Sequence, residues 1–227
     1  MCSTFDWQWK EAETLYRRAI ASNPSYAQAR HWFAVDFLVP LGRFDEAQRE
    51  LEMARRLDPL SQIIAEGCCA ILMYRRDYAG ALDTYRKLVE MDPTFYKGFS
   101  GMGRVLILMG RHEEALAAFT RALSLAGDVP NVIGAMAHAH AVAGQMEEAL
   151  RSLARLQEIA RTRTVHEVTL SVVYAGLGDI ERSLDSLERA CERREVGLAF
   201  VNVHPLYDVL RNHPRFHAVL RRIGFRN

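Results

Sequence analysis

Three glycines lie close together in the stretch GFSGMGR, at Gly98, Gly101 and Gly103, with a basic residue after them. Glycine-rich loops of this kind cradle phosphates, so the first chemistry to test is nucleotide binding. The spacing G-x-x-G-x-G reverses the usual fingerprint, which also needs a strand before it. The preceding Asp92-Pro93 is a chain break and predicts no strand. We therefore expect no nucleotide site and no cofactor, and the glycines need another explanation.

The histidines and cysteines form no arrangement typical of a metal site or a nucleophile. His138 and His140 are two residues apart on a predicted helix and point to different faces. His213 and His217 are four apart, but His213 precedes a proline and is expected to cap a helix. The cysteines lack zinc-type spacing, and we expect reduced thiols at Cys2, Cys68, Cys69 and Cys191. With no catalytic residue and no metal ligand predicted, an enzyme is disfavoured.

Composition narrows the remaining classes of function. The 227 residues carry a formal net charge of +1, which gives no electrostatic basis for binding nucleic acid or an anionic membrane. No apolar run approaches the length of a membrane span, and the N-terminus lacks the charged and apolar regions of a signal peptide. These features predict a cytoplasmic protein of ordinary globular composition.

Alanine recurs at a regular interval along most of the chain, and a bulky residue follows it by four positions. The interval is 35 residues once and 34 thereafter, and a glycine stands five positions before most copies. The small positions are Ala12, Ala47, Ala81, Ala115, Ala149 and Ser183; the bulky ones are Tyr16, Leu51, Tyr85, Phe119, Leu153 and Leu187; the glycines are Gly42, Gly110, Gly144 and Gly178, with Arg76 as the exception. Each copy predicts a helix, a turn and a second helix, with the small residues on one helical face.

This pattern resembles the tetratricopeptide repeat (TPR) family, whose period is 34 residues. The stretches GRFDEAQRELEMARRLDP and GRHEEALAAFTRALSLAG are similar to the family's second helix nearly position by position. The resemblance covers roughly residues 5–194 and implies an all-α fold, a right-handed superhelix (α-solenoid) of antiparallel helix pairs. We expect a solenoid over residues 1–194 and a C-terminal capping segment over residues 195–227.

The repeat also explains the glycines. Gly103 occupies the small position at which paired helices touch, and Gly110 is the turn between them. Gly98 and Gly101 are interpreted as surplus glycines in the same helix, each costing about 1 kcal/mol relative to alanine.

Both ends depart from the period. The chain begins with a second-type helix that lacks its partner, as if cut from a longer protein or capped in another way. The apolar residues of that helix predict either a homodimer through the open N-terminal end or a helix that folds back on the next pair. These residues are Trp7, Trp9, Leu15, Tyr16 and Ala19. At the other end, Pro205 and Pro214 each suit a first helical turn, so we expect an extended stretch followed by two short helices that cover the last repeat.

The C-terminal stretch HPLYDVLRNHPRFHAVLRRIGF and the opening FDWQWKEAETLYRRAI are similar to the TPR modules of bacterial signalling proteins. Such modules often follow a DNA-binding, nucleotide cyclase or kinase domain, and this chain contains none of these. The resemblance implies a regulatory module in a bacterial signalling or transcription-regulating protein.

In the TPR family, the first helices line a concave groove that holds a peptide. A mildly basic, partly aromatic groove of this kind would suit an acidic peptide or a carboxylate end. The residues at the groove-facing positions are His31, Trp32, Tyr74, Lys97, Ser100, Arg104, Asn131 and His138. The asparagine and lysine set of the chaperone-binding members is absent, which argues against chaperone tails as the partner.

Two hypotheses of function follow. The leading one is a non-catalytic scaffold that binds a protein or peptide. The alternative is a small-ligand sensor or enzyme that uses a pocket between the solenoid and the C-terminal cap. Clustering of His204, His213 and His217 around such a pocket would favour the alternative, whereas an empty polar groove lined by Lys97 and Arg104 would favour the scaffold.

Overall fold

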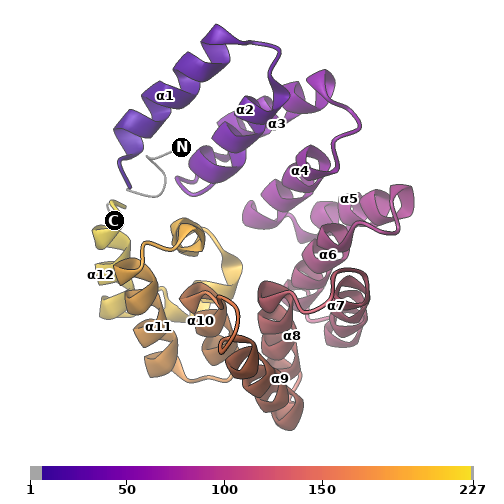
Figure 1. Ribbon diagram of the computed structural model, residues 1–227, viewed down its shortest axis with the longest axis vertical. Helices are drawn as coiled ribbons and strands as arrows, with labels where there is room; N and C mark the ends of the chain where they lie inside the picture. The colour runs from indigo at the N-terminus through magenta and orange to yellow at the C-terminus, as the bar shows by residue number, and fades with distance from the viewer. Residues whose placement is uncertain (1–6, 226–227) are drawn as a thin grey trace.

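The computed structural model describes residues 7–225, which form helices and turns with no strand in that range. Successive antiparallel helix pairs stack into a curved superhelix (Figure 1), which confirms the all-α repeat fold. The first helices of the pairs are α2 (Ala27–Trp32) with its continuation η1 (Phe33–Leu38), α4 (Gln62–Tyr74), α6 (Tyr96–Leu108), α8 (Pro130–Val142) and α10 (Glu167–Gly176). The second helices are α1 (Trp9–Ser22), α3 (Phe44–Leu57), α5 (Tyr78–Met91), α7 (His112–Ala126), α9 (Met146–Ile159) and α11 (Ile180–Glu192).

The periodic small residues are the points of closest contact between helices. All six of them, from Ala12 to Ser183, are fully buried. The bulky residue four positions later packs in the same contact, and both Tyr85 and Phe119 are inaccessible to solvent. Since one pair cannot cover its own apolar face, neighbouring pairs supply the rest of the core.

The turn glycines adopt the backbone conformation that the period predicts. Gly42, Gly110, Gly144 and Gly178 all have φ between +71° and +78°, the left-handed region in which glycine carries no penalty. Arg76 takes the same turn with φ of +68°. A side chain is therefore held in a disfavoured backbone conformation at the only repeat turn of residues 7–225 that lacks glycine.

The one 35-residue interval has a local structural cause. Fifteen positions separate Ala27 from Gly42, whereas fourteen separate Tyr96 from Gly110. The extra residue is absorbed by the π-helix η1, where the backbone N–H of Val39 donates to the carbonyl of Ala34, five residues earlier. The inserted residue thus widens one helical turn and leaves the inter-repeat contacts in register.

The glycines of α6 are required by close approaches. A Cβ on Gly103 would lie 2.7 Å from the Phe119 ring, as expected for the small contact position. A Cβ on Gly101 would lie 2.3 Å from the Tyr85 ring, and one on Gly98 would lie 2.8 Å from a methyl of Val89. The interpretation of Gly98 and Gly101 as surplus residues was therefore wrong, because each leaves room for a side chain of α5.

After α11 the chain folds back across the inner side of the superhelix. The expected extended stretch is instead a 3₁₀ helix, η2 (Val196–Asn202), and the two expected short helices are present as η3 (Pro205–Leu210) and α12 (Pro214–Arg222). Both prolines occupy the first helical turn, as predicted. Arg215 of α12 pairs with three acids of α11, Glu181, Asp185 and Glu188, at 2.6–2.8 Å. We call residues 196–225 the closing segment. The division of the chain into a solenoid over residues 1–194 and a capping segment over residues 195–227 remains a prediction.

We expect Ala115→Leu to lower the free energy of unfolding by about 1–3 kcal/mol, because a larger side chain would overpack a fully buried helix contact. Ala117→Leu on the same helix is the matched control, since Ala117 is exposed. Urea unfolding measures both. Equal midpoints for the two variants would contradict the register described above.

Asp36 in η1 forms no hydrogen bond or ion pair with residues 7–225, and burial raises the pKa of its carboxyl to about 6. The folded pKa lies above the unfolded one, so ionisation of Asp36 destabilises the fold increasingly as pH rises from about 4 to about 6. We expect Asp36→Asn to raise the free energy of unfolding by about 1–3 kcal/mol near neutral pH and to lose this gain toward pH 4. Urea unfolding over this pH range checks it, with the exposed Asp83→Asn as control; a gain independent of pH would contradict the explanation.

Candidate functional site

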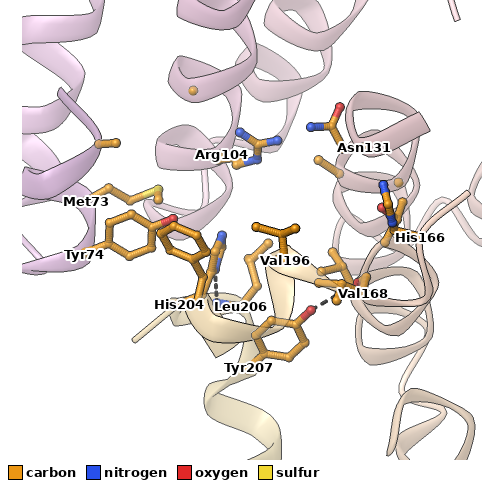
Figure 2. Close-up of a pocket in the computed structure, with 18 of the residues that line it drawn as sticks. Met73, Tyr74, Arg104, Asn131, His166, Val168, Val196, His204, Leu206 and Tyr207 are labelled. Atoms are coloured by element: carbon orange, nitrogen blue, oxygen red, sulfur yellow. Dashed lines mark hydrogen bonds between the residues drawn. The ribbon is translucent and has the colours of Figure 1, made fainter. Parts of the chain in front are cut away.

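A cavity of about 350 Å³ lies between the first helices and the closing segment. Its walls come from α4, α6, α8 and α10 on one side and from η2 and η3 on the other (Figure 2). Phe200 of η2 stacks on Tyr74 of α4 with ring centroids 5.9 Å apart, and His204 meets the same ring edge-on at 5.7 Å. The closing segment thus occupies part of the concave face and leaves this space beside it.

Arg104 and Asn131 provide polar groups at one side of the cavity, opposite Tyr74 and His204 (Figure 2). Arg104 follows Gly103 on α6, and Asn131 stands in the first turn of α8. Neither side chain has a hydrogen bond or ion pair with any residue in the described range 7–225. A guanidinium and an amide are therefore available to a ligand.

His204 is a neutral hydrogen-bond donor at the cavity wall. Its Nδ1 accepts a hydrogen bond of 3.2 Å from the backbone N–H of Leu206, which caps η3 and places the ring proton on Nε2. Burial, together with the positive charge of Arg104, lowers the pKa of His204 to about 3. The imidazole is therefore uncharged at physiological pH, and among residues 7–225 its Nε2–H has no acceptor.

Glu66 of α4 is the one carboxylate among the lining residues of the described chain. The hydroxyl of Tyr85 donates to it at 3.2 Å, and Gly101 makes this position of the Tyr85 ring possible. Burial raises the pKa of Glu66, opposed by the charge of Arg104 and the Tyr85 hydrogen bond. Glu66 and Arg104 influence each other across the cavity without forming an ion pair.

The rest of the lining is mostly apolar. Tyr207 holds η3 against α10, because its hydroxyl donates a hydrogen bond of 3.1 Å to the carbonyl of Val168. The apolar side chains of the wall are Met73, Val168, Val172, Val196, Phe200 and Leu206. The arrangement combines the guanidinium of Arg104, the carboxyl group of Glu66 and several neutral donors with an apolar wall, as small-ligand sites do.

The structure separates the eight groove residues expected from the sequence into three groups. His31, Ser100 and His138 are only 3–7 % exposed, so the expectation that they face a partner was wrong. His138 bonds instead to the carbonyl of Val172 at 3.0 Å, within the contact between α8 and α10. Tyr74, Arg104 and Asn131 line the cavity, while Trp32 and Lys97 are exposed outside its lining.

The histidines named for a pocket beneath the cap do not cluster. His204 lines the cavity, but His213 lies at the start of α12, where its Nδ1 accepts from the backbone N–H of Arg215 and caps the helix as predicted. His217 is on α12 and is not part of the lining. Among residues 7–225, no group of three or more histidine, cysteine or acidic side chains is placed to hold a metal ion. Cys68, Cys69 and Cys191 are unbridged, and Cys2 lies outside the described residues.

Sequence reasoning missed the part of the site that the closing segment contributes. Val196, Phe200 and Leu206 lie in a stretch without periodicity, so nothing in their spacing locates them on the inner face. Glu66 was missed because it stands in a helix with an otherwise apolar character. The run of His204, Pro205 and Tyr207 after the last repeat was the only indication, since it breaks the helix period with residues that bond locally.

The closing segment also reaches the first helix, because the start of α1 lies next to the end of α12 in Figure 1. The indole N–H of Trp9 donates to the carbonyl of Ile223 at 2.7 Å, and its ring stacks on Phe225 with centroids 5.1 Å apart. Tyr16 of α1 packs on Phe33 of η1 with ring centroids 5.4 Å apart. The chain itself therefore covers Trp9 and Tyr16 in part, whereas Leu15 and Ala19 are exposed, and a homodimer through this end stays a prediction.

Two further contacts hold the closing segment to the early repeats. Arg76 at the left-handed turn binds both carboxylate oxygens of Asp208 in η3, at 2.5 and 2.8 Å. The amide of Asn202 donates to the carbonyl of Pro40 at 3.1 Å. Together with the Trp9 contacts they close the superhelix into a ring around the cavity.

Comparison with known proteins agrees with this architecture. Residues 70–131 and residues 106–172 each match a tetratricopeptide repeat family model. The chain is 27% identical over 128 residues to anaphase-promoting complex subunit 3 of Schizosaccharomyces pombe, an alignment that covers 55% of this chain and 19% of that protein. The chain thus spans about a fifth of the length of this relative.

Two solved structures share the fold. A thermophilic TPR protein of Thermus thermophilus superimposes with a TM-score of 0.61 at 19% identity, over 86% of this chain and 99% of that one. The Cut9–Hcn1 assembly of the anaphase-promoting complex gives a TM-score of 0.67 at 12% identity, over 98% of this chain and 48% of that one. The two family models together cover residues 70–172, and with the repeat architecture they identify a tetratricopeptide-repeat protein. None of the helices within residues 7–225 is long and apolar enough to cross a membrane.

Deletion of residues 198–227 should uncover Trp9, Tyr74 and the apolar face of α11 at once. We expect the truncated protein to self-associate and to lose a cooperative melting transition, since terminal repeats need a polar outer surface. Light scattering and thermal unfolding beside the full-length chain measure this. A monomeric truncation with unchanged melting would show that the closing segment does not complete the core.

Proposed function

We propose that this protein is a non-catalytic scaffold that binds a protein or peptide along the inner edge of its repeats. The supporting observation is that accessible, recognition-type side chains stand on two of the first helices, α2 and α6. Trp32 on α2 is 41 % exposed and meets the exposed Tyr26 edge-on, with ring centroids 6.3 Å apart. Aromatic side chains of this kind dominate the energy of many protein interfaces.

Lys97 supplies a positive charge whose effect reaches α2. Lys97 in the first turn of α6 is exposed, and its charge adds to the effect of burial in lowering the pKa of His31, the residue next to Trp32. An exposed lysine together with exposed aromatic rings suits an acidic segment, because the ammonium group can form charge-assisted contacts with carboxylates. We therefore propose an acidic peptide or protein segment as the partner.

Binding is favoured over catalysis by the chemistry of the lining. The Nδ1 of His204 accepts from a backbone amide, so within residues 7–225 the lining pairs no nucleophile with a general base. The biological setting that we propose is regulatory, in a bacterial signalling or transcription-regulating protein located in the cytoplasm. This part of the proposal depends on the resemblance of the two ends of the chain to such modules.

The double variant Trp32→Ala/Lys97→Glu tests the interaction surface. We expect it to reduce binding of the partner by about tenfold or more without changing the melting temperature, because both residues are exposed and outside the core. The matched control is Lys87→Glu on the outer helix α5, which makes the same charge change at an exposed site.

The assay is affinity capture from lysate of the source organism, followed by titration of the captured partner against purified variants. A partner that binds the double variant and the wild type equally would contradict the proposed surface. Equal loss with Lys87→Glu would indicate a general charge effect instead.

A further inference from the structure

The cavity inside the ring holds polar groups that the protein itself leaves unused. Arg104, Asn131, His204 and Tyr74 all line it, and none of their cavity-facing polar groups has a hydrogen-bond partner among residues 7–225. None of these polar atoms is fully buried, so water can reach them when the cavity is empty, and a ligand that displaces this water must offer acceptors in its place.

The unused groups are mostly donors. The guanidinium of Arg104 is a planar, permanently charged fork that fits the two oxygens of a carboxylate. The Nε2–H of His204, the hydroxyl of Tyr74 and the amide of Asn131 add neutral donors around it. Glu66 is the one acidic lining residue of the described chain and already accepts from Tyr85. The balance of donors over acceptors favours an anionic group with oxygen acceptors.

The apolar part of the wall and the volume of the cavity determine the chemistry and size of the rest of the ligand. Val168, Val172, Val196 and Leu206 form an apolar surface next to these donors. A volume of about 350 Å³ falls at the lower end of the range of small-molecule sites. We propose that this cavity binds a small monocarboxylic acid with an aliphatic or aromatic body, its carboxylate on Arg104 and its body against the apolar wall.

A free acid fits this space better than the carboxyl end of a peptide. Phe200 stacks on Tyr74 and Leu206 packs beside it, so the closing segment fills the length of groove that an extended peptide would need. What remains is a space shared by repeats and closing segment, which one small molecule would occupy. The site is separate from the interaction surface at Trp32 and Lys97, which lie outside its lining.

Isothermal titration with matched ligand pairs tests the proposal on the full-length chain. The probes are straight, branched and phenyl-substituted monocarboxylates of roughly four to nine carbons, each beside its primary amide. We expect at least one acid to bind and its amide to bind about tenfold more weakly or not at all, because the amide cannot form the charge-assisted contact with Arg104.

Three variants locate the carboxylate. Arg104→Met should weaken binding of the acid by about tenfold or more, whereas Lys97→Met, the same charge change on the same helix outside the cavity, should leave it within about twofold. Asn131→Asp should also abolish binding, because it places a carboxylate of the protein beside Arg104. Asn131 is exposed in the first turn of α8, where a carboxylate is compatible with the helix, so we expect this variant to fold. It also keeps the side chain of Arg104 and therefore tests the anion site without removing any packing contact of that residue.

Four results would overturn the proposal. These are no binding by any acid of the panel, equal binding of acid and amide, equal loss with Lys97→Met, and tighter binding of a short peptide that ends in the same side chain than of the free acid. Each leaves the interaction surface at Trp32 untouched, since that surface is measured with different residues and a different partner.

Discussion

The contact between paired helices at the periodic small residue is the constraint on which this structure depends. Alanine or serine at that position lets two helices approach until the aromatic or leucine residue one turn later is fully enclosed, as at Ala81 and Tyr85. Each pair still presents an apolar face, so the pairs must stack, and the equal spacing of the contacts makes the stack curve regularly. Where the spacing is one residue too long, the π-helix η1 restores it, which shows that the contact register is kept at the expense of helix geometry.

A curved stack of this length has two exposed apolar ends, and one segment of the chain packs against both. α12 is docked on α11 by Arg215, and the residues after it reach Trp9 on the first helix. The unusual turn at Arg76 helps to hold this segment in place. A side chain at φ of +68° costs of order 1 kcal/mol or more, and a glycine would avoid it, but a glycine has no side chain with which to bind Asp208 of the closing segment. The backbone strain is thus offset by a bidentate ion pair that holds the ring closed.

The sequence predicted the repeats well because their information is local and repeated. Period, turn glycines and helix caps all concern residues within one copy, and the structure places them as expected from Ala12 to Ser183. The closing segment has no period, so only its prolines could be located, at the starts of η3 and α12. Its course across the inner face depends on long-range contacts such as Tyr74 with Phe200. Of the residues expected to face a groove, Tyr74, Arg104 and Asn131 line the cavity, and their role in binding stays a prediction. His31, Ser100 and His138 are buried, because position in the repeat does not reveal which inner residues a neighbour covers.

The cavity and the closure of the ring are physically linked, because the same segment makes both. η2 and η3 supply one wall of the cavity and carry the residues that bind the early repeats, Asn202 and Asp208. A molecule that fits the cavity contacts both walls and so stabilises the closed ring over any state in which the segment has moved away; the gain grows with ligand concentration relative to its dissociation constant. The contacts of Asn202 and Asp208 with the early repeats and the occupancy of the cavity therefore stabilise the same closed arrangement of the chain.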